Sequence, residues 1–336
     1  MSDVGINEGV NDLEFGHAES QPQVAAQPNA PYPVLTLPPE IILEIFERFL
    51  PNYPGFPLVV GPRSPLLLCR ICRQWRQIAL STPALWTSIL IKNINSPDQL
   101  ELLRAWLARS GDLPLSIGIV ATNNGPRCTE ILQAALAHCR RWEQAELIVP
   151  INIMPLLQAE MPLLRALTIG PVVVPVGGDG VVSVFEHAPQ LKRLTHLDAV
   201  ALYPHECAEI LAEALNLVHC SFMVLMSTDE IPVLPAPIPL PYLRHLTLLS
   251  DLSDTSDGDF SYMDLLYNFT LPALHTLHLY EPFISTNPLL HLHEFIARSG
   301  CSLHELRLEG ASWPLATYRA SFPSIQTIVL PTPTAS

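Results

Sequence analysis

The chain has 336 residues, of which 49% are hydrophobic and only 15% are charged, and its formal charge is -14 at pH 7. This balance favours a folded protein, because a disordered chain needs low hydrophobicity and high charge. An acidic chain with few Lys and Arg residues is poorly suited to neutralising phosphates, so we expect no nucleic-acid partner. Its apolar runs are shorter than the ~20 residues that cross a bilayer, so we expect no membrane partner either.

The first 34 residues differ from the rest in composition. Residues 1–34 are rich in acids, Gln, Asn, Ala and Pro and lack an apolar period, which predicts a disordered leader with order beginning near Leu35. The first 47 residues contain no Lys or Arg, so the basic start of a secretory signal is missing. Seven scattered cysteines form an odd set that suits reduced thiols. We therefore expect a cytoplasmic and/or nuclear protein.

A helical pattern begins after the leader. Pro38 and Pro39 suit a first helical turn, where the missing N–H donors are not needed. Apolar residues then recur at helical spacing over about three turns; they are Ile41, Ile42, Ile45, Phe46 and Phe49. Residues 51–65 hold five prolines and two glycines, which predict a loop.

A second helical pattern runs from about Leu66 to Leu80, with a break near Cys72. Beyond it, the alternation of Ile89 and Ile91 predicts a strand.

Residues 37–86 resemble the F-box family. Uncommon residues fall in the family's order here, namely Leu37-Pro38-Pro39-Glu40-Ile41-Ile42, Ile45-Phe46, Ile71-Cys72-Arg73-Gln74-Trp75-Arg76-Gln77-Ile78-Ala79 and Trp86. The segment 81–86 is similar to the variant that is common in the expanded F-box families of fungi. The proline-rich loop is longer than the minimal module requires, but the entropy cost of closing a loop rises only slowly with its length.

The resemblance implies a small trihelical domain that binds the Skp-type adaptor of cullin-RING ubiquitin ligases. It assigns the adaptor contact to Leu37, Pro38, Ile41, Ile45, Ile71, Cys72 and Trp75. A module this small has apolar side chains left over once its core is filled, and a partner can cover them. The competing interpretation is that these side chains form only the core of a local bundle. Five bases against three acids give this segment a net charge of +2, which suits an acidic partner.

The rest of the chain repeats the phrase Leu-x-x-Leu-x-Leu, often with a proline two residues before it. Clear copies begin at Leu164, Leu243, Leu274, Leu303 and Ile325, and weaker copies begin at Trp142 and Leu217. One further copy begins at either Leu191 or Leu194. With Leu191, the copies are 22 to 31 residues apart, close to the roughly 20 to 29 residues of a leucine-rich repeat. Each phrase would be a short strand whose leucines point into a continuous core.

Helical return segments are expected between some of the strands, at Glu130 to Cys139, Glu206 to Ala214 and His291 to Arg298. The asparagine that normally follows each leucine-rich-repeat strand is missing, so we expect an irregular, degenerate solenoid. The alternative is a compact α/β domain with several strands introduced by proline.

Alternate strand positions should face solvent on one side of the strands. These positions are Ala166, Thr168, His219, Ser221, His245, Thr247, Thr276, His278, Glu305, Arg307 and Glu309, with Tyr280 beside them. The candidates for binding a target protein are His245, Thr247, His278, Tyr280, Glu305 and Arg307. The alternative is an ordinary solvated sheet face.

Signals for catalysis are weak. Cys69 and Cys72 form a single CxxC pair, without the second pair that would complete a structural zinc site. The glycine motifs of phosphate loops, dinucleotide sites and nucleophile elbows are missing. We therefore expect no catalytic residue, no metal and no cofactor.

These patterns predict an α/β protein, with a small trihelical F-box followed by an irregular leucine-rich-repeat solenoid. The expected divisions are a disordered leader at 1–34, the F-box at 35–86, the degenerate repeats at 87–331 and a tail at 332–336. The function they favour is a non-catalytic substrate receptor of an SCF-type cullin-RING ubiquitin ligase, with the repeats binding a target protein. The alternatives are a leucine-rich-repeat scaffold without a role in ubiquitin transfer and a hydrolytic enzyme hidden in the repeats.

Overall fold

The computed structural model describes residues 37–331 except 52–54, 58, 93, 95, 97, 122–124, 151, 154–155, 157–158, 172–188, 226–235, 251–263 and 285–286. The predicted leader and the predicted tail lie outside the described residues. The chain divides into two units, Met1–Pro38 and Pro39–Ser336, and every described helix and strand belongs to the second. Within the described ranges, no helix combines the length and the hydropathy needed to traverse a bilayer.

The second unit begins with a helical module, residues 39–86. It contains α1 (Pro39–Phe49), α2 (Pro65–Ile71), α3 (Arg73–Leu80) and the short 3-10 helix η2 (Pro83–Trp86). The predicted break is confirmed: Cys72 has an extended backbone that ends α2, and its Sγ accepts a hydrogen bond from the amide of Trp75 at 3.4 Å. Such a cap satisfies an amide that the first turn of α3 leaves unpaired.

The core of the helical module is small and aromatic. Ile42, Phe46 and Ala79 are fully buried, and the rings of Phe46 and Trp75 meet edge to face with centroids 5.0 Å apart. Trp86 closes the module, because its indole N–H donates to the carbonyl of Ala79 at 2.8 Å.

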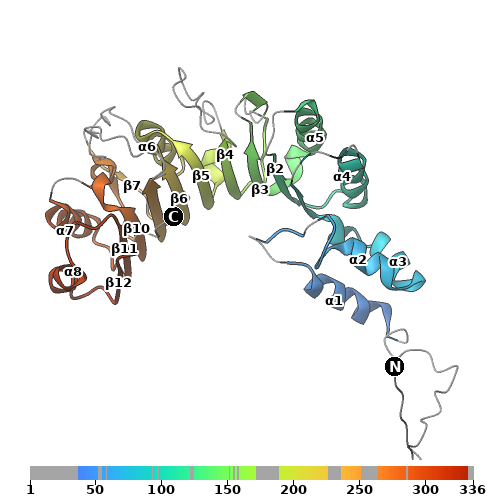
Figure 1. Ribbon diagram of the computed structural model, residues 1–336, viewed down its shortest axis with the longest axis horizontal. Helices are drawn as coiled ribbons and strands as arrows, with labels where there is room; N and C mark the ends of the chain where they lie inside the picture. The colour runs from blue at the N-terminus through green and yellow to red at the C-terminus, as the bar shows by residue number, and fades with distance from the viewer. Residues whose placement is uncertain are drawn as a thin grey trace, which may run out of the picture. The chain divides into compact units, whose positions relative to one another are not determined.

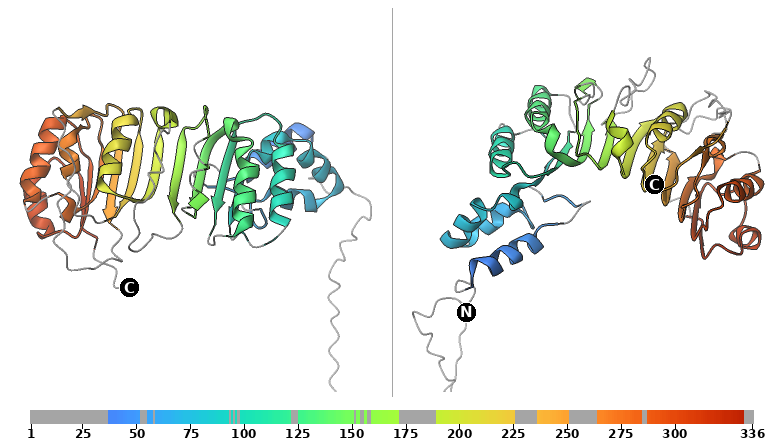
Figure 2. Two further views of the ribbon diagram at one scale, coloured as in Figure 1. Left: turned by 90° about the horizontal axis from the view of Figure 1, so that it is seen from above. Right: turned by 180° about the vertical axis from the view of Figure 1, so that it is seen from behind.

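Ten parallel strands of the same unit form one sheet, in which each strand lies beside the next one along the chain, apart from a separate β7–β9 pair (Figures 1 and 2). The strands are β1 (Ser88–Lys92), β2 (Leu115–Val120), β3 (Trp142–Val149), β4 (Ala166–Pro171), β5 (His196–Leu202), β6 (His219–Val224), β8 (His245–Ser250), β10 (Thr276–Tyr280), β11 (Glu305–Glu309) and β12 (Thr327–Val329). The separate pair is β7 (Ile238–Pro239) with β9 (Phe269–Thr270). The predicted mixture of helix and sheet is confirmed.

Five helices follow strands of the sheet and lie against one of its faces (Figure 1). They are α4 (Asp98–Arg109), α5 (Pro126–Leu136), α6 (Pro204–Glu213), α7 (Pro288–Ser299) and α8 (Leu315–Ser321). Short 3-10 helices are η3 (Cys139–Arg141), η5 (Pro189–Arg193), η6 (Asp264–Asn268) and η7 (Glu281–Phe283). The opposite face carries none of these five helices (Figure 1).

Most copies of the repeated phrase begin with a tight turn. The amide of Leu164 donates to the carbonyl of Met161, and that of Leu274 to Leu271, both at 3.1 Å. The proline two residues before each of these leucines takes the second position of the turn, where its fixed φ is favoured. The later apolar positions of the phrase then enter a strand and point into the core.

Backbone hydrogen bonds link the residues that follow the first leucine of successive copies. The amide of Arg244 donates to the carbonyl of Val218 at 2.9 Å, His275 donates to Arg244 at 2.8 Å, and His304 donates to His275 at 2.9 Å. The ladder thus extends past the strand ends, and each copy is held directly by the copy before it.

The strand register resolves the ambiguous copy of the phrase. Leu197 pairs with Leu167 and Ala199 pairs with Ile169, so this copy begins at Leu194, and a start at Leu191 is wrong. Leu194 is fully buried, and its amide donates to Leu191 at 3.2 Å in the usual turn. The error arose because both leucines are buried and only one of them is in register.

Several elements differ from the sequence-based expectation. The repeated phrase predicts neither β2 nor α4 nor α8. The three predicted return helices begin two to four residues earlier than expected, and each has a proline in its first turn, at Pro126, Pro204 and Pro288. Proline at the start of a helix is a recognised signal that would have placed these boundaries.

The long loop at 51–65 lies against the first strand of the sheet. Its Pro57 is buried, and the carbonyl of Pro57 accepts a hydrogen bond from the amide of Leu90 at 3.2 Å. β1 pairs with β2 along its other edge. The loop therefore covers part of a strand edge that would otherwise offer unpaired backbone groups to other chains.

Candidate functional site

Four aliphatic side chains of α1 and α2 in the helical module are exposed. The amphipathic helix α1 buries Ile42 and Phe46, while the neighbouring Ile41 and Ile45 remain 44% and 40% exposed. On α2, Leu67 is 43% exposed and Ile71 is 53% exposed. We call these four side chains, Ile41, Ile45, Leu67 and Ile71, the exposed aliphatic set.

The residues predicted to contact an adaptor fall into different environments. Ile41, Ile45 and Ile71 are exposed, as a contact requires. Trp75 is only 7% exposed and belongs to the core, where it supports α1 through Phe46. Cys72 is partly exposed, but its sulfur already caps α3. Leu37 is partly buried and Pro38 is exposed; both precede α1. Their contact role stays a prediction.

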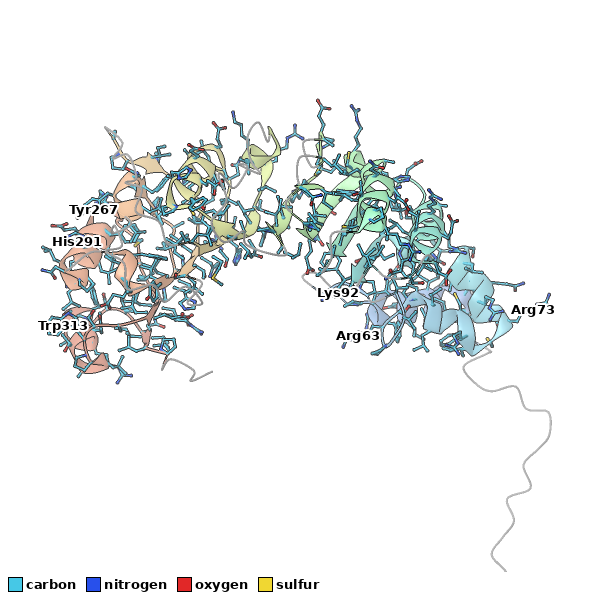
Figure 3. All side chains as sticks on the ribbon, turned by 45° about the horizontal axis from the view of Figure 1, so that its top comes forward. Arg63, Arg73, Lys92, Tyr267, His291 and Trp313 are labelled. Atoms are coloured by element: carbon cyan, nitrogen blue, oxygen red, sulfur yellow. The ribbon has the colours of Figure 1, made fainter. Side chains whose placement is uncertain are left out.

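Arginines accompany the exposed aliphatic set. Arg63, Arg70, Arg73 and Arg76 all have exposed side chains, and Figure 3 shows Arg63 and Arg73 on the surface of the helical module. Arg76 is fixed in place, because its Nε donates to the carbonyl of Cys69 at 2.7 Å. The helical module thus exposes both aliphatic and cationic side chains, a combination suited to an acidic protein partner.

A known family matches this part of the chain. The F-box-like family model matches residues 34–92. Residues 34–92 form an F-box-like domain. The matched range contains all seven residues that the sequence assigned to the adaptor contact, and it reaches beyond the predicted end at residue 86 to include β1. No curated protein matches the chain.

A second candidate surface is the helix-free face of the sheet that follows the F-box-like domain. The register aligns two rows of side chains across this face. The first row is Gln144, Ala166, His196, His219, His245, Thr276, Glu305 and Thr327. The second row is Glu146, Thr168, Asp198, Ser221, Thr247, His278, Arg307 and Val329.

The six candidates for binding a target share this face. His245 and Glu305 lie in the first row, Thr247, His278 and Arg307 lie in the second, and Tyr280 lies beside Glu309 in the adjacent register position. A hydrogen bond joins two neighbouring strands here, with His278 Nε2 3.0 Å from Glu309 Oε1. An ion pair lies within β11, with Arg307 Nε 2.6 Å from Glu305 Oε1. Their common location is confirmed, while their binding role stays a prediction.

The prediction that Ala166 faces solvent is wrong. Ala166 belongs to the first row, but it is only 3% exposed. Its methyl group is too short to reach past Gln144 and His196, which flank it on the neighbouring strands. Position on the face therefore does not ensure exposure when the side chain is small.

Sequence reasoning missed one histidine of the first row. His196 was not assigned to the face, because the register that starts at Leu191 places it at a core position. In the structure, His196, His219 and His245 are aligned on three successive strands. Their rings are stacked, and we call these three residues the histidine ladder. The correct register, which pairs Leu197 with Leu167, would have revealed it.

A cavity of about 500 Å³ lies near the C-terminal end of the sheet. Its lining includes His293, Cys301 and His304. Burial raises the pKa of the Cys301 thiol, which is the opposite of what a nucleophilic thiolate needs. The ring of His293 stacks on Phe322 with centroids 4.3 Å apart. The stacking of His293 is an ordinary packing contact, and the raised pKa of Cys301 does not indicate an activated nucleophile.

Proposed function

We propose that this protein is the substrate-receptor subunit of an SCF-type cullin-RING ubiquitin ligase. The observation that carries the proposal is the F-box-like match at residues 34–92, together with the exposed aliphatic set inside it. F-box domains generally bind Skp-type adaptors, and the adaptor recruits the cullin. In this role the chain is not itself an enzyme, and it needs no cofactor.

The exposed aliphatic set supports an adaptor contact on energetic grounds. Fully burying an isoleucine or leucine side chain stabilises by roughly 1.5 to 3 kcal/mol. Each member of the set is about half exposed, so a partner that covered all four would gain on the order of 1 kcal/mol from each. The exposed arginines of the module would add specificity and speed of association toward an acidic partner more than affinity.

We further propose that residues 87–331 are a degenerate leucine-rich-repeat solenoid that binds the target protein. The repeated turn, the strand order and the backbone hydrogen bonds between successive copies support this assignment. The helix-free face would hold the target while the F-box-like domain holds the adaptor. The contribution to ubiquitin transfer would then be a raised effective concentration of the target beside the ligase.

Co-purification tests the proposal. The tagged full chain should recover a Skp-type adaptor and a cullin, and Ile41→Asp should abolish this recovery. Aspartate suits the first turn of α1, because the helix dipole favours a negative charge there. Leu113→Asp is the matched control, since Leu113 is also 40% exposed but lies outside the domain. Failure of the folded wild-type protein to recover an adaptor would overturn the proposal.

The scaffold alternative makes a different prediction. If the protein binds partners without promoting their turnover, no bound partner should become more abundant when the chain is deleted. If the protein is a substrate receptor, at least one bound protein should accumulate when the chain is deleted. The same protein should accumulate when Ile41→Asp is the only form of the chain in the cell.

A further inference from the structure

The histidine ladder presents three imidazoles in contact on an open protein face. The ring centroids of His196 and His219 are 4.6 Å apart, with the rings inclined by 12°. Those of His219 and His245 are 4.1 Å apart and inclined by 6°. All three side chains are partly exposed, on the face without helices. Neighbouring strands lie about 4.8 Å apart, so identical ring side chains in one row are brought to stacking distance.

The charged and titratable groups around the ladder differ from one end to the other. They are Arg165, Asp198, Arg244, His275 and Glu305. On the β4 side, Arg165 lies 3.8 Å from Glu143, and Asp198 accepts a hydrogen bond from Thr168 at 3.4 Å. Asp198 is thereby directed toward β4, away from the two histidines on β6 and β8.

On the β8 side, Arg244 and Glu305 bring charges of both signs near His245. Glu305 is held by Arg307 at 2.6 Å, and its negative charge still acts to raise the pKa of His245. Arg244 directly precedes His245, and among the described residues no carboxylate lies within ion-pair distance of it. Although the whole chain is acidic, the region around His219 and His245 therefore offers one cation, Arg244, that forms no ion pair with a described carboxylate.

Burial and the contact between the rings make protonation costly. Burial, and then the neighbouring His245, His196 and Arg244, lower the pKa of His219 from 6.5 to about 4. Burial, and then His275, lower the pKa of His245. An anion placed against the ring edges would relieve this repulsion and raise both pKa values, because an opposite charge favours the protonated form. Anion binding and proton uptake are therefore linked at this site.

We propose that the histidine ladder is a docking site for an acidic segment of a partner protein, which binds with uptake of protons. The carboxylates of the segment would lie along the edges of His219 and His245, with Arg244 beside them. This inference rests on the proposed function, since it specifies the chemistry of the target that the helix-free face holds. It adds that the target offers Glu or Asp side chains and that its binding strengthens as the pH falls.

The geometry favours this occupant over a metal ion. Stacked rings direct their nitrogens side by side and not toward a common point. Among the described residues, no group of three or more His, Cys, Asp or Glu side chains is arranged to hold a metal. Hydrogen-bond donors at protonated ring edges suit carboxylates, to which they make charge-assisted bonds.

The test uses the full chain and a synthetic Glu-rich peptide, with a Gln-for-Glu peptide of the same length as its matched probe. Calorimetric titration at about pH 6 and about pH 8 should give tighter binding of the Glu peptide at the lower pH. The affinity should change by up to about tenfold per pH unit for each proton taken up. Repeating the titration in two buffers of different ionisation enthalpy measures that uptake. Equal binding of the two peptides, or binding that is independent of pH, would overturn the proposal.

Two variants and a control assign the effect to the ladder. His219→Gln should lose the pH dependence and most of the binding. His245→Lys places a permanent cation in the row and should bind the Glu peptide even at about pH 8. His291→Gln is the control, because His291 lies on α7 and contacts Tyr267 instead of the ladder (Figure 3). If His219→Gln and His245→Lys both bind like wild type, the ladder is not the site.

The outcome can be separated from that of the proposed function. Recovery of the adaptor by the F-box-like domain should be unchanged in His219→Gln. Failure of the peptide to bind while the adaptor is recovered would remove the acidic-segment inference alone. Loss of adaptor recovery by the wild type would instead remove the receptor function.

Discussion

Trp86 of the F-box-like domain packs edge to face against Trp106 of α4, with ring centroids 4.8 Å apart and the rings inclined by 78°. Both side chains are fully buried. The indole N–H of Trp106 donates to the carbonyl of Ser88 at 3.2 Å, and the guanidinium of Arg109 lies 4.9 Å from the Trp86 ring. The domain and the first repeats therefore share one core.

Because the core is shared, a substitution at the contact between Trp86 and Trp106 should destabilise both parts together. Trp106→Ala should lower the free energy of unfolding by about 3 to 5 kcal/mol, through lost burial and the cavity that remains. Urea denaturation followed by fluorescence and by circular dichroism measures this, and the two signals should shift together. Trp313→Ala is the control: Trp313 is 51% exposed, and its loss should change stability by no more than about 0.5 kcal/mol. Separate transitions for the two parts in Trp106→Ala would contradict a common core.

A buried carboxylate joins η7 to α8. Glu281 is 1% exposed; it accepts a hydrogen bond from the Tyr318 hydroxyl and another from the Ser312 amide at 2.8 Å. Tyr318→Phe removes one donor and leaves a buried carboxylate partly unsatisfied. We expect a loss of about 1 to 3 kcal/mol in the free energy of unfolding, measured with urea. A change below about 0.5 kcal/mol would show that the bond contributes little.

The same tyrosine predicts an alkaline dependence of stability. Burial, and then the bond to Glu281, raise the pKa of Tyr318 above its ordinary value of 10.0. The folded state therefore keeps the phenol protonated, so this contribution is complete below pH 10 and is lost as the pH rises through the folded-state pKa. Tyr318→Phe should lose less stability than wild type over this alkaline range. Identical profiles for the two proteins would contradict the assignment.

The histidine ladder predicts an acid dependence of stability. The pKa of His219 is lowered to about 4 from 6.5, so between these values the unfolded chain binds the proton more readily than the folded one. Its contribution to stability is complete above pH 6.5 and is lost as the pH falls toward 4. Urea midpoints should fall across this window in wild type and fall less in His219→Gln. His291→Gln should follow wild type, and an equal fall in all three proteins would contradict the prediction.

Local signals predicted the N-terminal part of the fold well. The helix after Pro38 and the break at Cys72 follow from short-range rules about apolar period and backbone capping, and the structure has both. Exposure was harder to predict, because helical spacing alone does not separate Ile41 from Ile42. Only the packing of α3 against α1 decides that Ile42 is covered and Ile41 is not.

Register was the main limit in the repeats. Because side chains alternate across a strand, the choice between Leu191 and Leu194 decides whether His196 faces solvent. Both leucines are buried, so hydrophobicity could not choose between them. The neighbouring strand decides the matter, through the pairing of Leu197 with Leu167, and this information is not local to the sequence.

The adaptor contact is the central claim, and a direct binding titration with the purified full chain and a purified Skp-type adaptor tests it best. Wild type should bind, Ile41→Asp and Ile71→Ser should each weaken binding by about tenfold or more, and Leu113→Asp should bind like wild type. Circular dichroism of each variant establishes that it is folded. A folded wild-type protein that does not bind the adaptor, or Ile41→Asp and Ile71→Ser variants that bind as tightly as wild type, would contradict the account.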